Sequence, residues 1–238
     1  MKKKKRVIVF IISAMLFSFI SLNNISNREK DLIENETIKE EINELVEIED
    51  DNKIEIDFNE LKKQNKDTVA YLKVNNTNID YAIVQTNNNS YYLKHNFKKE
   101  YNTAGWLFLD YRNKLNGKDR NLIIYGHNMK NGSMMGSLKN TLKKDWYLNN
   151  DNLEITFITD KEQFKYKVFS IYQIKVEDYY IKTIFKSDKD YMKFLNTLKN
   201  RSIYNFDIQL NKDDKILTLS TCAKGHSERI VLHAKLIK

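Results

Sequence analysis

Ile216-Leu217-Thr218-Leu219-Ser220-Thr221-Cys222 is the stretch of sequence that decides the fold of this chain. Its apolar and β-branched residues alternate with hydroxyl residues, which favours a half-buried strand. The strand ends at the single cysteine of the 238 residues, and Ala223-Lys224-Gly225-His226 then begins a loop. A side chain at the end of a rigid strand is held firmly and still reaches solvent, as nucleophilic catalysis requires. Cys222 is therefore either a nucleophile or one of the many cysteines that only pack in a core.

The N-terminus carries a basic flank followed by an apolar run. Lys2 to Arg6 are all basic, and Val7 to Leu22 is almost entirely apolar. A run of this length lies at the lower limit of a membrane span, and Asn23 to Arg28 offers no pattern of small residues for signal cleavage. We therefore expect residues 1–27 to form an uncleaved single-pass membrane anchor, with a cytoplasmic N-terminus and an extracellular remainder.

Export changes the interpretation of the cysteine. Disulfides form outside the cytoplasm, but a lone cysteine cannot form one within its own chain. An unpaired thiol is a liability in that compartment unless chemistry needs it. The sequence therefore favours Cys222 as a nucleophile.

The composition limits the classes of function. The formal net charge is +8, and the five basic residues of 2–6 leave +3 for the rest of the chain, which is too little to indicate nucleic-acid binding. With six glycines and no metal-ligand spacing, we expect neither a cofactor nor a metal. After an acidic segment at 28–55, expected as a stalk or N-terminal helix, residues 56–238 suffice for one domain.

The periodicity of the sequence predicts a mainly β chain with peripheral helices. Alternation with a period of two indicates a hairpin of Val69–Val74 and Ile79–Val84, after a helical start at Asp57–Asn65. Further strands are expected at 105–110, 121–125, 153–159, 163–173, 216–222 and 229–237. Helical segments are expected at 90–93, 134–142 and 189–198, the last with Tyr191, Phe194, Leu195 and Leu198 turned inward.

A thiol is an effective nucleophile only when it is ionised, so a partner for Cys222 is needed. His127 is the best placed of the four histidines, because it follows the apolar strand Asn121–Tyr125 directly. His95 is expected at the surface, His226 lies in the loop after the cysteine, and His233 is expected to pack inside a strand. Arg229 opens the strand after that loop, where its guanidinium suits an oxyanion, although an arginine paired with Glu228 is the plainer interpretation.

At these residues the chain resembles the sortases. Thr218-Leu219-Ser220-Thr221-Cys222 is similar to the sortase TLxTC signature, Tyr125-Gly126-His127 to the histidine at a strand end, and Arg229–Ala234 to the arginine strand. Three further features resemble class B sortases: Asn78–Tyr81 with Val84-Gln85, the run Tyr91–Phe97, and the helix inserted between Lys175 and Tyr204.

The resemblance implies a closed eight-stranded β-barrel with N-terminal helices and a helix inserted between strands 6 and 7. It also implies a membrane-bound transpeptidase that cleaves a C-terminal sorting signal of exported proteins after threonine. The enzyme would then pass the thioacyl intermediate to an amine of peptidoglycan or lipid II. In this scheme Cys222 is the nucleophile, His127 the general acid and base, and Arg229 the group that stabilises the oxyanion. The implied substrate contacts are Leu93, Tyr180, Ile181, Ser220 and Thr221.

The chain departs from the family pattern in three places, and several alternative functions stay open. Ala82 stands where the family has a proline and Ala70 where it has a glycine, and the loop from Cys222 to Arg229 is short, which affects substrate preference. A simple cysteine hydrolase is one alternative, although papain-like enzymes place the cysteine at a helix start and before the histidine. An inactive binding module with the same fold and a pilin-polymerising sortase are the others; against the latter, the chain has no proline for a lid motif.

Overall fold

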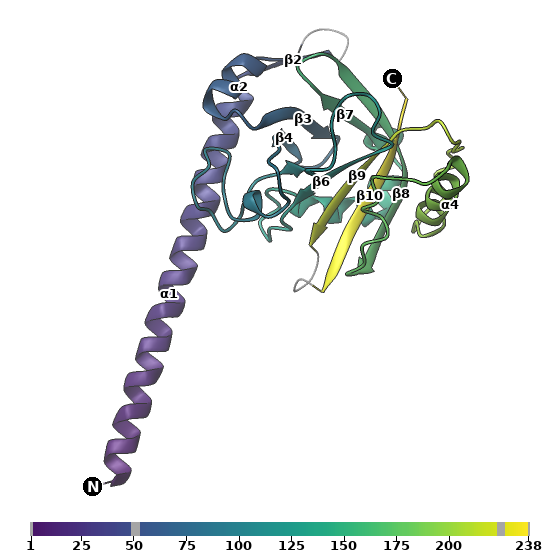
Figure 1. Cartoon of the computed structure of the whole chain (residues 1–238). Helices are drawn as coiled ribbons and strands as arrows, with labels where there is room; N and C mark the ends of the chain where they lie inside the picture. The colour runs from purple at the N-terminus through teal and green to yellow at the C-terminus, as the bar shows by residue number, and fades with distance from the viewer. Residues whose placement is uncertain (1, 49–52, 223–226, 238) are drawn as a thin grey trace.

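The barrel is closed by eight strands in the order β10-β8-β7-β3-β4-β5-β6-β9 (Figure 1). This arrangement comes from a computed structural model, which describes residues 2–48, 53–222 and 227–237. All neighbouring pairs are antiparallel except β4–β5 and β6–β9, which are parallel. The closed eight-stranded barrel expected from the sequence is confirmed.

The barrel strands follow the predicted order along the chain. Their bounds are β3 Thr68–Val74, β4 Asp80–Val84, β5 Phe108–Leu109, β6 Asn121–Gly126, β7 Glu154–Ile158, β8 Gln163–Lys175, β9 Ile216–Cys222 and β10 Glu228–Leu236. Short helices cover the connections: α2 Phe58–Gln64, η2 Tyr91–Leu93, η3 Gly136–Leu142, α3 Lys144–Tyr147 and η4 Asn150–Leu153. The inserted helix α4, Asp188–Asn200, lies between the sixth and seventh barrel strands, as expected.

Two predicted elements differ from the structure. The strand expected at 105–110 is reduced to β5, because Gly105 has a φ of +59° and a Cβ there would lie 2.3 Å from the Tyr92 carbonyl oxygen. The helix expected at 134–142 is instead the 3₁₀ helix η3. It begins at Gly136, where a Cβ would lie 2.2 Å from the carbonyl oxygen of Met129. In both places the backbone approaches too closely for the regular element that the hydrophobic pattern predicts.

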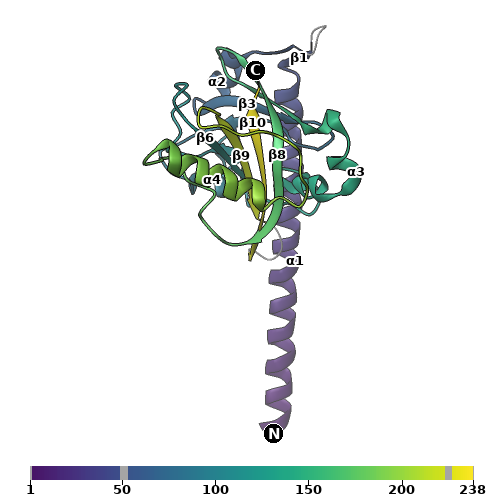
Figure 2. The same ribbon diagram turned by 90° about the vertical axis from the view of Figure 1, so that its right-hand side faces the viewer.

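The N-terminal helix α1 runs from Lys2 to Asn43 and passes position 27 without a break. Its first part projects away from the barrel, whereas Asn35, Ile38 and Ile42 are buried against it (Figures 1 and 2). The acidic segment 28–55 is thus helical as far as Asn43, and its remaining strands, β1 Val46–Ile48 and β2 Ile54–Ile56, pair with each other.

The expected membrane anchor is wrong. Within the described residues, no helix combines the length and the apolar character that crossing a bilayer requires. The single-pass topology inferred from the basic flank and the apolar run is therefore not supported.

Two apolar clusters lie on opposite faces of the same strands. Ile230, Leu232 and Ala234 of β10 belong to the large cluster that fills the barrel, whereas Val231 belongs to a smaller one. The smaller cluster lies beneath α4, which covers the outside of β8, β9 and β10 (Figure 2). The α4 residues predicted to face inward are all buried: Tyr191, Phe194, Leu195 and Leu198. Burial on both faces explains why the middle of β10, Ile230–Leu232, is continuously apolar, and why the polar residues Thr218 and His233 are buried and need hydrogen-bond partners.

His233 on β10 is fully buried beside side chains of β8 and β9, within a chain of hydrogen bonds. Thr218 donates its hydroxyl hydrogen to Asn121 Oδ1 (2.7 Å), so its oxygen accepts from His233 Nδ1 (2.9 Å). The other ring nitrogen, Nε2, then accepts from the Tyr172 hydroxyl at 2.8 Å. The ring is therefore neutral with the proton on Nδ1, and the prediction of a packed histidine at this position is confirmed.

Acid should weaken the fold through His233. Burial lowers the pKa of this ring to about 3, whereas the unfolded chain binds the proton near its ordinary pKa of about 6.5. Between these values the unfolded state holds more protons, so stability falls as the pH drops below 6.5, by up to about 1.4 kcal/mol per pH unit. Urea unfolding from pH 7 to pH 4.5 should show a stability difference between wild type and His233→Gln that shrinks with acidification. A difference that stays constant would contradict the buried neutral ring.

Candidate active site at one end of the barrel

The ends of three neighbouring strands bring Cys222, His127 and Arg229 together. β9 lies between β6 and β10, with Thr221 opposite Gly126 and Cys222 opposite Arg229. Adjacent strands lie about 4.8 Å apart, so the backbones of Cys222 and Arg229 are neighbours, and His127 follows Gly126 directly on the other side. The side chain of Cys222 lies outside the described part of the structure, and the register gives the position of its backbone.

His127 is partly exposed and its ring is oriented by the backbone of another segment. Its Nε2 lies 2.8 Å from the carbonyl oxygen of Leu93 at the end of η2. A carbonyl oxygen only accepts hydrogen bonds, so Nε2 carries the proton, and in the neutral ring Nδ1 is the acceptor. The backbone after the strand is fixed as well, because the His127 carbonyl accepts from the N–H of Met135 at 3.0 Å.

Arg229 lies at the start of β10, with a paired strand on each side. It is partly buried, pairs with Cys222 on β9 and with Ile174 on β8, and donates from Nη1 to the carbonyl oxygen of Glu228 at 3.1 Å. The Glu228 carboxylate accepts from the side-chain amide of Gln173 at 2.6 Å. The guanidinium is thus a cation within reach of the end of β9.

The predicted substrate contacts divide into two groups. Leu93 is 36% exposed and Ile181 is half-buried, so both offer apolar surface beside the strand ends. Tyr180, Ser220 and Thr221 are buried. The Tyr180 hydroxyl lies 3.0 Å from Ser220 Oγ, and Thr221 donates to the Gly126 carbonyl at 2.7 Å. These three buried residues hold the ends of β6 and β9 and the segment of Ile181 in place. His226 lies outside the described residues.

Sequence reasoning missed a buried carboxylate beside the site. Asp110 follows β5 and is fully buried, and its two oxygens accept hydrogen bonds from Arg112, Tyr125 and Asn89. Burial alone would raise its pKa, but the guanidinium and backbone N–H of Arg112 and the Tyr125 hydroxyl outweigh it and lower the pKa. The available signal was an Asp-x-Arg pattern directly after an apolar run, where a carboxylate needs a cation if it is buried.

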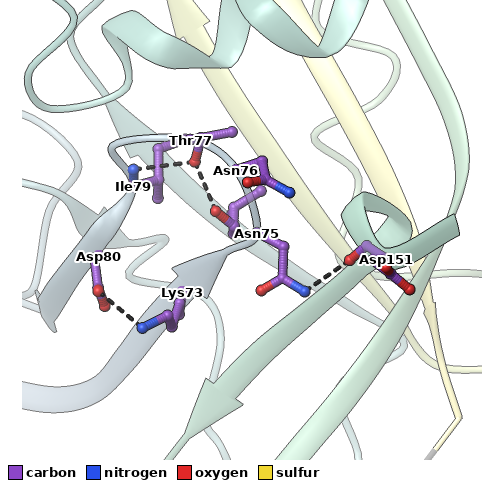
Figure 3. A pocket seen from close by; sticks show the side chains of 8 residues that line it. Lys73, Asn75, Asn76, Thr77, Ile79, Asp80 and Asp151 are labelled. Carbon is purple, nitrogen blue, oxygen red and sulfur yellow. Dashed lines mark hydrogen bonds and ion pairs between the residues drawn. The ribbon is translucent and has the colours of Figure 1, made fainter. Parts of the chain in front are cut away.

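Two cavities of the described structure are lined by residues other than those at these strand ends. A hollow of about 210 Å³ lies at the β3–β4 turn (Figure 3). The polar side chains that line it already have partners: Asn75 donates to the Asp151 carbonyl, Thr77 donates to the Val74 carbonyl, and Lys73 pairs with Asp80. A second cavity, of about 470 Å³, is lined by residues of α1 and by Asn78, Asn131 and Ser133. Among the described residues no group of three or more metal-ligating side chains converges.

The sequence is similar to known proteins over most of its length. The Sortase domain family matches residues 72–237. The Sortase B of Listeria monocytogenes is 38% identical over 184 residues, which cover 76% of this chain and 74% of that protein.

Solved structures agree with this similarity. The crystal structure of sortase B from B. anthracis in complex with AAEK1 is 36% identical, with a TM-score of 0.78 over 88% of this chain and 99% of that one. A Staphylococcus aureus sortase B–substrate complex is also 36% identical, with a TM-score of 0.71, and the match covers 76% of this chain and 84% of that one.

The hydrogen bond between β6 and β9 at the site should contribute measurably to stability. Thr221→Val keeps the shape but removes the buried bond to the Gly126 carbonyl, and we expect the free energy of unfolding in urea to fall by about 1–2 kcal/mol. Thr197→Val is the matched control, since its hydroxyl bonds to the Lys193 carbonyl (2.9 Å) on the exposed side of α4. That change should cost less than about 0.5 kcal/mol. Equal losses in the two variants would contradict this view of the strand end.

Proposed function

The chain belongs to the sortase family of cysteine transpeptidases, and we propose that it cleaves a C-terminal sorting signal of exported proteins after threonine and transfers the acyl group to a cell-wall amine. Residues 56–238 form the proposed catalytic domain. The observation that carries the proposal is the strand register, in which the backbone of Cys222 lies between Arg229 and the end of the strand that leads to His127.

In the proposed first half-reaction, the Cys222 thiolate attacks the threonine carbonyl carbon. The charge that develops on the carbonyl oxygen is stabilised by Arg229. As the C–N bond breaks, His127 donates a proton to the leaving amine, and the acyl group stays on sulfur as a thioester. The hydrogen bond from Nε2 to the Leu93 carbonyl supports Nδ1 as the nitrogen that exchanges this proton.

In the second half-reaction, an amine attacks the thioester carbonyl. His127 removes the proton from the amine, and the thiolate of Cys222 leaves. The acceptor that we propose is an amine of peptidoglycan or lipid II, as in the family that the sequence resembles.

The proposed substrate is a peptide held between two walls. Leu93 and Ile181 supply apolar contacts, and Tyr180, Ser220 and Thr221 support them from behind. The substrate complex of the S. aureus sortase B supports a peptide in this role.

The test is a cleavage assay with fluorescent threonine-containing peptides and an added amine. Cys222→Ala should reduce turnover by about 10⁴-fold or more, His127→Ala by about 10²–10⁴-fold, and Arg229→Ala by about 10²–10³-fold. His95→Ala is a matched control, because His95 also bonds a backbone carbonyl, that of Tyr91 at 2.8 Å, and it should leave the rate nearly unchanged.

The products separate the proposal from its alternatives. Mass spectrometry should find the peptide joined to the amine through its threonine carbonyl, and replacing that threonine with valine should abolish cleavage. Hydrolysis with every amine tried would instead favour a simple hydrolase. Turnover that persists in Cys222→Ala would remove the nucleophile from the scheme.

A further inference from the structure

Three consecutive backbone carbonyls beside the site are each held by a side chain from another element. Asn121 donates from Nδ2 to the carbonyl oxygens of Tyr180 (3.2 Å) and Lys182 (3.0 Å). Arg112 donates from Nη2 to the carbonyl oxygen between them, that of Ile181, at 2.9 Å. We call Asn121 and Arg112, with these three carbonyls, the carbonyl clamp.

The clamp acts on a segment that has no regular structure of its own. Residues 176–187 connect β8 to α4 without a helix or a strand. The position of such a segment is set by the partners that its backbone groups find. Within it the Ile181 N–H bonds to the Asp178 carbonyl, so the carbonyl clamp supplies backbone bonds from 180–182 to the barrel, beside the side-chain contact of Tyr180 with Ser220.

Each donor of the clamp is itself fixed. Asn121 is fully buried, and its Oδ1 accepts from Thr218 on β9 at 2.7 Å. Arg112 forms a two-point contact with Asp110, from Nε at 2.8 Å and from Nη2 at 2.6 Å. A guanidinium can address a carboxylate and a carbonyl at once because its donors form a rigid planar fork, which the point charge of a lysine does not offer.

Asp110 extends this linkage to the opposite wall of the site. Its Oδ2 accepts from Tyr125, two residues before His127, and from Asn89 in the loop that leads to Leu93. The bonds are 2.8 and 2.9 Å long. One buried carboxylate therefore connects the segment that ends at Leu93, the strand that ends at His127 and, through Arg112, the segment of Ile181.

We propose that Arg112 is a positioning residue for the peptide substrate: by joining Asp110 to the Ile181 carbonyl, it fixes the distance between the Leu93 wall and the Ile181 wall. This inference rests on the proposed function, in which both walls contact the peptide. Arg112 itself touches no reacting atom in this scheme. Its loss should therefore weaken peptide binding and leave the chemical step unchanged.

The test compares Arg112→Gln with Arg120→Gln. Both arginines have 34% exposed side chains and carboxylate contacts of 2.6 Å, but Arg120 bonds Asp188 at the start of α4. We expect Arg112→Gln to raise the KM for the peptide about 10-fold, with kcat within about 2-fold and an unchanged pH profile of kcat. Arg112→Lys should recover little of the loss, and Arg120→Gln should behave as wild type.

Hydrogen exchange gives a readout that does not depend on activity. Amides of residues 178–187 should exchange faster in Arg112→Gln and not in Arg120→Gln, while the barrel strands keep their protection. Should Arg112→Gln fail to fold, Arg112→Lys takes its place in both measurements, because it keeps the charge that balances Asp110.

The outcomes separate this inference from the proposed function. An active wild type with an unchanged KM in Arg112→Gln, or a loss confined to kcat, would overturn the positioning role. A wild type that cleaves no peptide would refute the proposed function, and with it the substrate part of the inference. In that case unchanged exchange at 178–187 would also overturn the structural part, and faster exchange there would support it.

Discussion

The parallel pairing of β6 with β9 is the constraint on which the rest of the structure depends. These strands are distant in sequence, and their register extends from Asn121 opposite Ile216 to Gly126 opposite Thr221. Side chains alternate between the two faces of a sheet, so a slip of one residue would turn every side chain of the slipped strand to the opposite face. Buried polar contacts across the pair, from Thr218 to Asn121 and from Thr221 to Gly126, make such a slip costly. The pairing that closes the barrel therefore also fixes the relative positions of the strand ends at the candidate site.

Much of this architecture could be predicted from the sequence because burial leaves a clear periodicity. β10 alternates between the barrel interior and the cluster beneath α4, and α4 buries the four residues that its pattern indicates. The shortening of β5 could not be predicted, since it depends on how closely the backbone at Gly105 approaches Tyr92. The anchor prediction failed for another reason: it rested on a local apolar run and its flanking charge, whereas no described helix is both long and apolar enough to cross a bilayer.

The residues proposed for catalysis could be predicted from the sequence, whereas the buried polar residues around them could not. Cys222, His127 and Arg229 each stand at a strand end, where local pattern and chemistry coincide, and the structure brings these strand ends together. Asp110 and Asn121 carry no comparable signal, because a buried polar residue reveals itself only through partners that are far away in sequence. Asn121 illustrates this, because three hydrogen bonds of its side chain join Thr218, the neighbour of His233, to the backbone of 180–182. Polar groups of this kind specify one arrangement among the many that an apolar core alone would tolerate.

Closure of the barrel also determines how a partner peptide can be recognised. In the described chain each of the eight barrel strands has a neighbour on both sides, so the barrel has no edge strand to which an extended ligand could add. Recognition must then come from connecting loops mounted on a rigid frame. Loops can therefore change, and with them the preferred ligand, while the sheet that aligns the proposed reactive groups stays the same.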